Sequence, residues 1–317
     1  MSVPFDVQQY TSAVVFAYHN VGVRCLSVLL AHGVKIPLVV THTDNPSENI
    51  WFDSVATLAR EHDIPVITPD DPNLPEIVAQ ISALQPDFIF SFYYRNMLKT
   101  ELLDIPMRGA LNMHGSLLPK YRGRVPINWA IIKGETETGS TLHYMTEKPD
   151  NGAIVDQQSI PILPNDSAME VFHKVTCAAE VALNRCLPLL IDGTAPAIAQ
   201  DLSKGAYFGG RRPEDGKIEW QRDALAIHNL IRAVAPPYPG AYTTLSGKPM
   251  RVLRSMVETG RAAQHEAPCF YCEDGKCYAE CGNGSVLRIL DFDIDGESMN
   301  AAKFIATYGP ALLTLGN

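Results

Sequence analysis

An amide and an imidazole stand two residues apart in the stretch Leu111–Pro119, which reads LNMHGSLLP. If this stretch is a β-strand, Asn112 and His114 share one face, because alternate residues of a strand point to the same side. A histidine can move a proton near neutral pH, and an asparagine amide can donate a hydrogen bond to a developing oxyanion. Acyl transfer to an amine needs both groups. The alternative is that the two side chains merely tie down a strand end, but the Gly-Ser and proline loop that follows favours catalysis.

A third candidate is Asp150, within the sequence Lys-Pro-Asp-Asn-Gly. A carboxylate that faced His114 would raise the pKa of the imidazole and orient its ring. Asp-Asn-Gly is also a common turn sequence. The spacing alone does not choose between these interpretations.

Short apolar runs alternate with helix-like segments over the first part of the chain, which predicts a doubly wound, mainly parallel sheet. The expected strands are 12–17, 36–41, 64–67, 87–92 and 109–114, and the expected helices are 21–31, 52–61 and 75–84. A later strand pair is expected at 138–145 and 153–162, and Ser167 with Glu170 forms a capping box that opens a helix to about residue 191. Such sheets bind ligands at the carboxyl ends of their strands, where Asn112 and His114 would lie. No glycine-rich nucleotide loop follows the first strand, so the α/β pattern does not itself indicate a dinucleotide.

The sequence predicts two domains joined by a linker. Residues 1–204 form the expected catalytic domain, and the linker is 205–216, rich in glycine and charge (GAYFGGRRPEDG). Residues 217–317 begin with a helix at 223–233 and continue as short strands separated by turns at 246–248, 273–275 and 282–284. This pattern is typical of a small β-barrel.

The composition argues against several classes of partner. The 317 residues carry 26 basic and 35 acidic side chains, a net charge of −9, and neither half is basic. An acidic chain is poorly suited to a nucleic-acid backbone. No apolar run approaches a membrane span, and the first 15 residues lack a signal-type stretch, so we expect a cytoplasmic protein with no membrane partner. The sequence leaves homo-oligomer formation open.

The motif around these candidates resembles the signature of the folate-dependent formyltransferases. The similar stretches are Leu111–Ile131 (LNMHGSLLPKYRGRVPINWAI) and Leu142–Val155 (LHYMTEKPDNGAIV). The resemblance implies a Rossmann-like α/β fold with an OB-like C-terminal barrel, and N10-formyltetrahydrofolate as the co-substrate. It also implies a catalytic triad of Asn112, His114 and Asp150, no metal in the catalytic site, and a cis peptide bond between Leu118 and Pro119.

Further matches extend over nearly the whole chain. They include Val15–His19, Thr41–Pro46, Ser91–Arg95, Phe208–Pro213 and Tyr238–Ala241. These residues are similar to those of family members that formylate UDP-4-amino-4-deoxy-L-arabinose for lipid A modification and polymyxin resistance. The resemblance therefore implies a small nucleotide sugar as acceptor. Alternatives are another nucleotide-linked amino sugar, water in a hydrolase, and methionyl-tRNA. The absence of Lys and Arg from residues 45–54 counts against the tRNA.

The resemblance also implies positions that hold the folate. They are Asn96, Met97 and Leu98, then Arg124, then Thr146, Glu147, Lys148, Pro149 and Asp150. The 96–98 stretch follows a strand and could offer backbone groups to a pterin. Arg124 could pair with a carboxylate or phosphate, or be a solvated loop charge. Asn96 differs from the residue that the resemblance leads us to expect at this position. A folate contact through the backbone would be unaffected by this difference, whereas a side-chain contact would change.

Two further features stay open. Cys269, Cys272, Cys277 and Cys281 put four thiols within 13 residues, but their spacing is not a standard zinc pattern. In a hairpin, Cys277 and Cys281 would share a face, whereas Cys269 and Cys272 would face opposite ways.

The adjacent aromatic residues at 93 and 94 could stack on a pterin or uracil, and we expect at least one to pack in the core.

Overall fold

The computed structural model describes residues 10–315. Within that range the chain divides into two compact units. The first unit comprises the described residues up to 123, then 139–160 and 174–207; the second comprises 124–138, 161–173 and the residues from 208 onward. Segments 124–138 and 161–173 thus group with the second unit although they precede the expected linker. The domain boundaries 1–204 and 217–317 stay a prediction.

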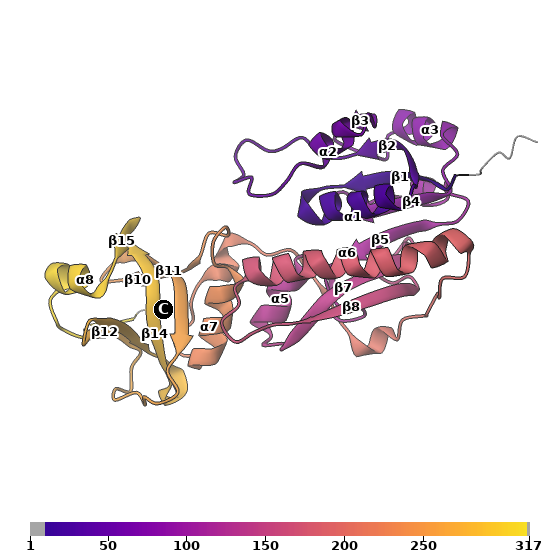
Figure 1. Ribbon diagram of the computed structural model, residues 1–317. Coiled ribbons are helices and arrows are strands. Elements are labelled where there is room, and N and C mark those ends of the chain that lie inside the picture. The colour runs from indigo at the N-terminus through magenta and orange to yellow at the C-terminus, as the bar shows by residue number, and fades with distance from the viewer. Residues whose placement is uncertain (1–9, 316–317) are drawn as a thin grey trace, which may run out of the picture. The chain divides into compact units, whose positions relative to one another are not determined.

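A seven-stranded mixed sheet forms the middle of the first unit, in the order β3-β2-β1-β4-β5-β7-β8 (Figure 1). Its strands are β1 (Ser12–Ala17), β2 (Lys35–Val40), β3 (Val66–Ile67), β4 (Phe88–Phe92), β5 (Ala110–His114), β7 (Glu137–Tyr144) and β8 (Ile154–Pro161). Strands β1 to β5 run parallel to one another, and β7 runs antiparallel to β5. The expected doubly wound, mainly parallel sheet is therefore confirmed.

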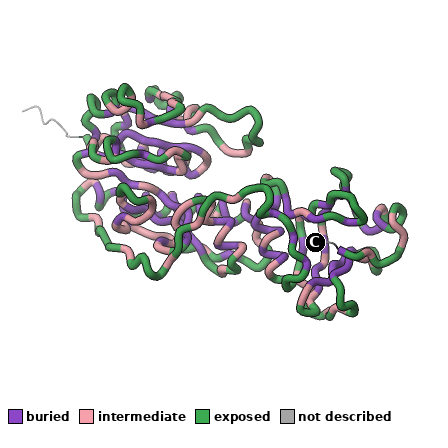
Figure 2. Tube along the Cα trace, turned by 180° about the vertical axis from the view of Figure 1, so that it is seen from behind, coloured by how far each residue is buried: buried purple, intermediate pink, exposed green. Residues whose placement is uncertain are grey.

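Helices cover both faces of this sheet, which explains why the central strands β1 and β4 are buried over nearly their whole length. The helices are α1 (His19–Ala31), α2 (Val55–Glu61), α3 (Pro75–Ala83), α4 (Thr100–Leu103) and α6 (Ala168–Asp192). On one face Val14 and Phe16 pack with Ile81 of α3 and Leu102 of α4. On the other face α1 and α6 lie side by side, joined by an ion pair between Arg24 and Glu180. The strands between the two layers of helices are buried (Figure 2).

The start of α6 shows how local sequence fixes an element. The Ser167 backbone N–H donates to the Glu170 carboxylate at 2.7 Å, and the Glu170 N–H points back to the Ser167 hydroxyl at 3.5 Å. This reciprocal pair is the expected capping box. Strands β7 and β8 and helix α6 each have one end in a segment counted with the second unit. The two-residue strands β6 (Arg122–Gly123) and β9 (Tyr207–Phe208) lie where the chain passes between the units.

The second unit contains a curled antiparallel sheet in the order β10-β11-β14-β13-β12-β16, with β15 paired to β14. Its strands are β10 (Ala241–Leu245), β11 (Lys248–Val257), β12 (Cys269–Glu273), β13 (Lys276–Glu280), β14 (Val286–Ile294), β15 (Glu297–Met299) and β16 (Leu313–Thr314). Its helices are α5 (Pro126–Ile132), α7 (Ala224–Ala233) and α8 (Ala301–Tyr308). One antiparallel bridge between Leu245 and Leu315 links the two edge strands, so the sheet curls into a half-closed barrel. Trp220, Phe270, Phe292 and Phe304 are buried in its core.

Short 3₁₀ turns occur at Leu202–Lys204, Pro213–Gly216 and Gly282–Gly284. The last of them coincides with a turn expected from the glycines. None of the helices between residues 10 and 315 is both long enough and apolar enough to cross a bilayer.

Candidate active site

The strand β5 brings Asn112 and His114 to the carboxyl end of the sheet, on one face. Both lie on the same side as Ala110, which packs in the apolar cluster beneath α3 and α4. His114 is 6% exposed, and Asn112 is half-buried. The spacing of the two residues therefore predicted their shared face correctly.

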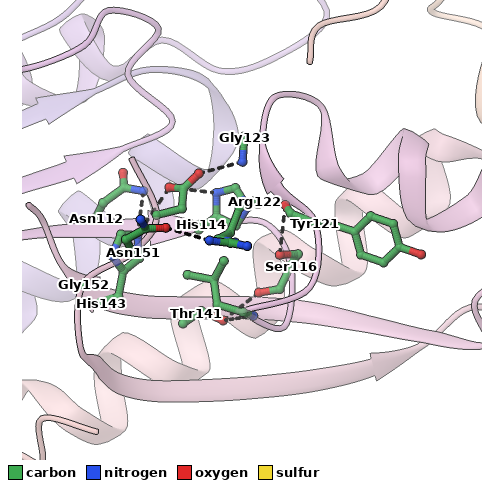
Figure 3. Close-up of polar contacts among 12 residues, drawn as sticks. Asn112, His114, Ser116, Tyr121, Arg122, Gly123, Thr141, His143, Asn151 and Gly152 are labelled. Carbon is green, nitrogen blue, oxygen red and sulfur yellow. Dashed lines mark hydrogen bonds and ion pairs between the residues drawn. The ribbon is translucent and has the colours of Figure 1, made fainter. Parts of the chain in front are cut away.

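The turn after β7 brings Asp150 back to His114, although the two residues are 36 positions apart. The Asp150 Oδ1 lies 3.5 Å from His114 Nδ1, and its Oδ2 accepts a 2.8 Å hydrogen bond from the Gly123 N–H (Figure 3). Asp150 has φ 56°, a left-handed conformation that Asp tolerates better than most residues. The Gln200 amide donates to the Asp150 carbonyl at 2.9 Å and so holds the turn.

Gly152 makes this turn sterically feasible. A Cβ at that position would lie 1.8 Å from the Tyr144 carbonyl oxygen. The turn therefore passes too close to the end of β7 for any side chain. The Asp-Asn-Gly sequence is both a turn, as its composition indicates, and the segment that presents Asp150 to His114.

A fourth polar residue, His143, belongs to this cluster and was missed by the sequence analysis. The antiparallel register pairs Asn112 with His143 and His114 with Thr141. The Asn112 Nδ2 donates to His143 Nε2 at 3.2 Å, and His143 Nε2 also lies 3.6 Å from the Asp150 carboxylate. The signal that could have found it is the same two-residue spacing, because Thr141 and His143 form a second polar pair on the neighbouring strand.

The backbone partners of the two histidines fix which ring nitrogens carry protons. His114 Nε2 lies 2.8 Å from the Tyr121 carbonyl, and His143 Nδ1 lies 2.8 Å from the Tyr144 carbonyl. Because a carbonyl only accepts, both of these nitrogens carry hydrogen. In the neutral rings, His114 Nδ1 and His143 Nε2 then carry lone pairs and can only accept hydrogen bonds. His143 can accept from Asn112, and His114 Nδ1 faces Asp150 ready to receive a proton.

The electrostatics agree with a neutral base beside an ionised acid. Burial lowers the pKa of His114, and this effect outweighs the raising effects of the Asp150 charge and the Tyr121 carbonyl. Burial raises the pKa of Asp150, but the charge that His114 can carry and the hydrogen bond from the Gly123 N–H lower it, and the pKa is about 2. Asp150 therefore raises the pKa of His114 as expected, yet the net direction is downward because the ring is enclosed.

The loop after β5 is tied firmly to β7. The Leu118–Pro119 peptide bond is cis, as the resemblance implied. The Thr141 hydroxyl donates to the Ser116 carbonyl at 2.6 Å and accepts from the Leu118 N–H at 3.1 Å. The Ser116 hydroxyl in turn donates to the Lys120 carbonyl at 2.6 Å. These bonds fix the path of the chain up to Tyr121, whose carbonyl sets the tautomer of His114.

Apart from Arg124, the residues expected to hold a folate fall in two loops of the first unit. Asn96 donates from its side chain to the Asp70 carbonyl at 2.9 Å, and Met97 is 53% exposed. Leu98 instead packs in the apolar cluster beside the half-buried Met145. The 146–150 loop starts directly after Met145, so the two loops rest on one cluster.

The rest of the expected folate positions differ in surroundings. Thr146 donates to the Lys148 carbonyl at 2.9 Å, Glu147 and Lys148 are exposed, and Pro149 is half-buried. Arg124 belongs to the second unit, where its N–H donates to the Phe208 carbonyl at 2.9 Å. It directly follows Gly123 in the chain.

An aromatic cluster adjoins the carboxyl ends of β1, β2 and β4. The Tyr94 ring stacks on His42 with centroids 4.1 Å apart and meets Phe16 edge-on at 5.3 Å. Its hydroxyl is buried without a hydrogen-bond partner. Tyr94 is therefore the core-packing member of the 93–94 pair.

Comparison with known proteins shows the family of this chain. Residues 26–187 match the Formyl transferase family, and residues 211–309 match the Formyl transferase C-terminal domain. The chain belongs to the formyl transferase family. The enzyme is thus a formyltransferase, and the cluster of Asn112, His114, His143 and Asp150 lies within the matched N-terminal region.

Solved structures of other proteins share the fold of this formyltransferase. An N-formyltransferase from Helicobacter canadensis, in complex with folinic acid and dTDP-3-aminofucose, is 21% identical, with 88% of this chain and 98% of that chain covered and a TM-score of 0.68. The sugar 3N-formyltransferase WlaRD, with dTDP and 5-N-formyl-THF, is 20% identical, covering 88% and 97% at a TM-score of 0.70. HypX from Aquifex aeolicus, with tetrahydrofolic acid, is 15% identical, covering 92% and 46% at a TM-score of 0.59.

Proposed function

We propose that this formyltransferase moves a formyl group from N10-formyltetrahydrofolate to the 4-amino group of UDP-4-amino-4-deoxy-L-arabinose. The observation that carries the proposal is the polar cluster itself. A neutral imidazole nitrogen faces an ionised carboxylate, and an amide donor lies beside them at the carboxyl end of β5. An amine acylation uses a base to take the amine proton and a donor to hold the oxyanion, and the carboxylate orients the base.

In the first step the acceptor amine attacks the formyl carbon, and a C–N bond forms while the carbonyl oxygen becomes an oxyanion. Asn112 carries two amide hydrogens. One is engaged by His143 Nε2, and the second is free to donate to the oxyanion. The hydrogen bond from Asn112 to His143 fixes the amide plane, so the second N–H has a defined direction before substrate binds.

Proton transfer then uses His114. Its Nε2 hydrogen is held by the Tyr121 carbonyl, so the proton leaving the attacking amine goes to Nδ1. There it meets Asp150 Oδ1, and the resulting imidazolium pairs with the carboxylate. When the tetrahedral intermediate collapses, the bond to N10 breaks, and the same proton passes to N10 of the leaving tetrahydrofolate.

A folate co-substrate is supported by the neighbouring structures with folinic acid, 5-N-formyl-THF and tetrahydrofolic acid. We assign it to the loops 96–98 and 146–150. Exposed Met97 offers backbone groups at the end of the first loop, and Leu98 anchors that loop in the core. Arg124 would pair with an anionic group of a substrate. The catalytic chemistry needs no metal.

The choice of acceptor rests on sequence resemblance over nearly the whole chain and on charge. A nucleotide amino sugar as acceptor is supported by the Helicobacter canadensis structure, a complex with dTDP-3-aminofucose. The alternative is therefore another nucleotide-linked amino sugar. Methionyl-tRNA is disfavoured by the net charge of −9. The corresponding biological role would be cytoplasmic synthesis of aminoarabinose for lipid A and polymyxin resistance.

Release of tetrahydrofolate tests this proposal directly. The enzyme is incubated with N10-formyltetrahydrofolate and, in parallel, UDP-4-amino-4-deoxy-L-arabinose, dTDP-linked 3- and 4-amino sugars, methionyl-tRNA or no acceptor. Turnover with the UDP sugar at the highest kcat/KM is expected. A higher kcat/KM with a dTDP sugar would identify that sugar, and not the UDP sugar, as the acceptor. Turnover without any acceptor would make the enzyme a hydrolase.

A further inference from the structure

The hairpin of β12 and β13 in the second unit sorts its side chains onto two faces. The register pairs Phe270 with Ala279 and Cys272 with Cys277, and these four residues belong to the barrel core or pack against it. The alternate pairs therefore point outward. They are Cys269 with Glu280, Tyr271 with Tyr278, and Glu273 with Lys276.

The loop of residues 258–268, which precedes β12, lies over this outer face. Arg261 stacks above Tyr278 at 4.2 Å and pairs with Glu273. Four residues before β12, the His265 backbone N–H and Nδ1 lie 2.9 and 3.0 Å from Glu280 Oε2. His265 Nδ1 is also 3.8 Å from Cys269 Sγ. The loop thus adds an imidazole to the outward-facing thiol and carboxylate.

One oxygen of the buried Glu280 carboxylate has no hydrogen-bond partner of good geometry. Its side chain is 1% exposed, yet Oε1 has no hydrogen-bond partner, while Oε2 takes both bonds from His265. A buried carboxylate oxygen without a donor is costly. The neighbouring Cys269 is 1% exposed. A cation at this position would satisfy the free oxygen and displace the thiol proton.

From this juxtaposition we propose that His265, Cys269 and Glu280 bind a zinc ion on the outer face of the barrel. One nitrogen, one sulfur and one carboxylate oxygen lie within 4.8 Å of one another. Tetrahedral zinc with ordinary bond lengths would place its nitrogen and sulfur ligands about 3.5 Å apart, close to the 3.8 Å seen between His265 Nδ1 and Cys269 Sγ. A mixed thiolate, imidazole and carboxylate set suits zinc better than magnesium or calcium.

The site differs from the four-cysteine cluster that the sequence brought to attention. Cys272 and Cys277 face each other on the inner side of the hairpin, with sulfurs 3.0 Å apart, and Cys281 is buried in the barrel core. Only Cys269 points outward. The ion would fasten the 258–268 loop to the hairpin, and it takes no part in formyl transfer.

Cobalt substitution in the full-length, chelator-treated protein tests the site, with a phosphine reductant present to keep the thiols reduced. One equivalent of Co²⁺ per chain should produce a thiolate-to-metal charge-transfer band and the intense visible bands of four-coordinate cobalt. Zinc should abolish both signals at one equivalent. Loss of a ligand in His265→Ala or Cys269→Ser should weaken zinc binding at least about 100-fold in competition with a chromophoric chelator.

The controls separate a specific site from loose thiol binding. Cys177 is an exposed cysteine on α6, so Cys177→Ser should leave the cobalt spectrum and zinc affinity unchanged. Serine at the buried Cys269 also perturbs packing, whereas His265→Ala changes a side chain that is 49% exposed and so keeps the test independent of folding. The proposal is overturned if no charge-transfer band forms, if the band survives in His265→Ala, or if only Cys272→Ser removes it.

Discussion

The most informative perturbation is Asn112→Ala. The proposed mechanism gives one amide N–H of this residue to His143 and the other to the oxyanion. Loss of one oxyanion donor costs about 10²–10³ in kcat, or about 2.7–4 kcal/mol of transition-state stabilisation. The ground-state loss is smaller, because a single neutral hydrogen bond contributes about 1 kcal/mol to stability. Turnover should therefore fall far more than thermal stability.

The structure also predicts that His143 acts through Asn112. His143→Ala frees the Asn112 amide plane, and the lost positioning bond of about 1 kcal/mol corresponds to roughly fivefold in kcat. In the Asn112→Ala background the same change should cost about twofold or less, because there is no amide left to position. A double-mutant cycle measures this coupling.

Single-turnover formyl transfer with saturating substrates is the appropriate assay, because it isolates the chemical step from product release. Asn184→Ala is the matched control, since Asn184 is exposed and makes a comparable 2.9 Å side-chain contact with His32 on the far side of the sheet. It should retain full turnover. The oxyanion assignment is wrong if Asn112→Ala loses less than tenfold in kcat. Fully additive effects of the two substitutions would refute the positioning role of His143.

Three further predictions concern the base, the acid and the turn. The acidic limb of the kcat/KM profile should lie below pH 6.5, because burial lowers the pKa of His114 and keeps it neutral; a limb above 6.5 would contradict this. Asp150→Asn should preserve the turn, since Asn tolerates φ 56° and can accept a hydrogen bond from the backbone. It should lower kcat by about 10²–10⁴ and move the acidic limb to still lower pH, because Asp150 raises the pKa of His114. An unchanged rate and pH profile would count against the role of Asp150. Gly152→Ala would put a Cβ 1.8 Å from the Tyr144 carbonyl oxygen and should cost about 1–3 kcal/mol of stability in a thermal melt. Gly209→Ala, where a Cβ meets nothing within 4 Å, is its control, and equal melting temperatures would refute the steric argument.

The sequence by itself determined the elements and the first half of the site. Strand β1 matches its expected range of 12–17, and most other elements end within a few residues of the prediction, because the apolar periodicity directly reports burial. The two-residue spacing placed Asn112 and His114 on one face, since a strand alternates its side chains whatever its neighbours are.

The tertiary structure alone decided what meets these two residues. Asp150 reaches His114 only through the β7 turn, and His143 reaches Asn112 only through the antiparallel register of β5 with β7. The direction of the His114 pKa shift also depended on the fold, because burial outweighed the carboxylate. Local spacing fixes which way a side chain points along its own strand. Which strands become neighbours, in what register, and how much water they exclude depend on contacts distant in sequence, and the chemistry of this site depends on those contacts.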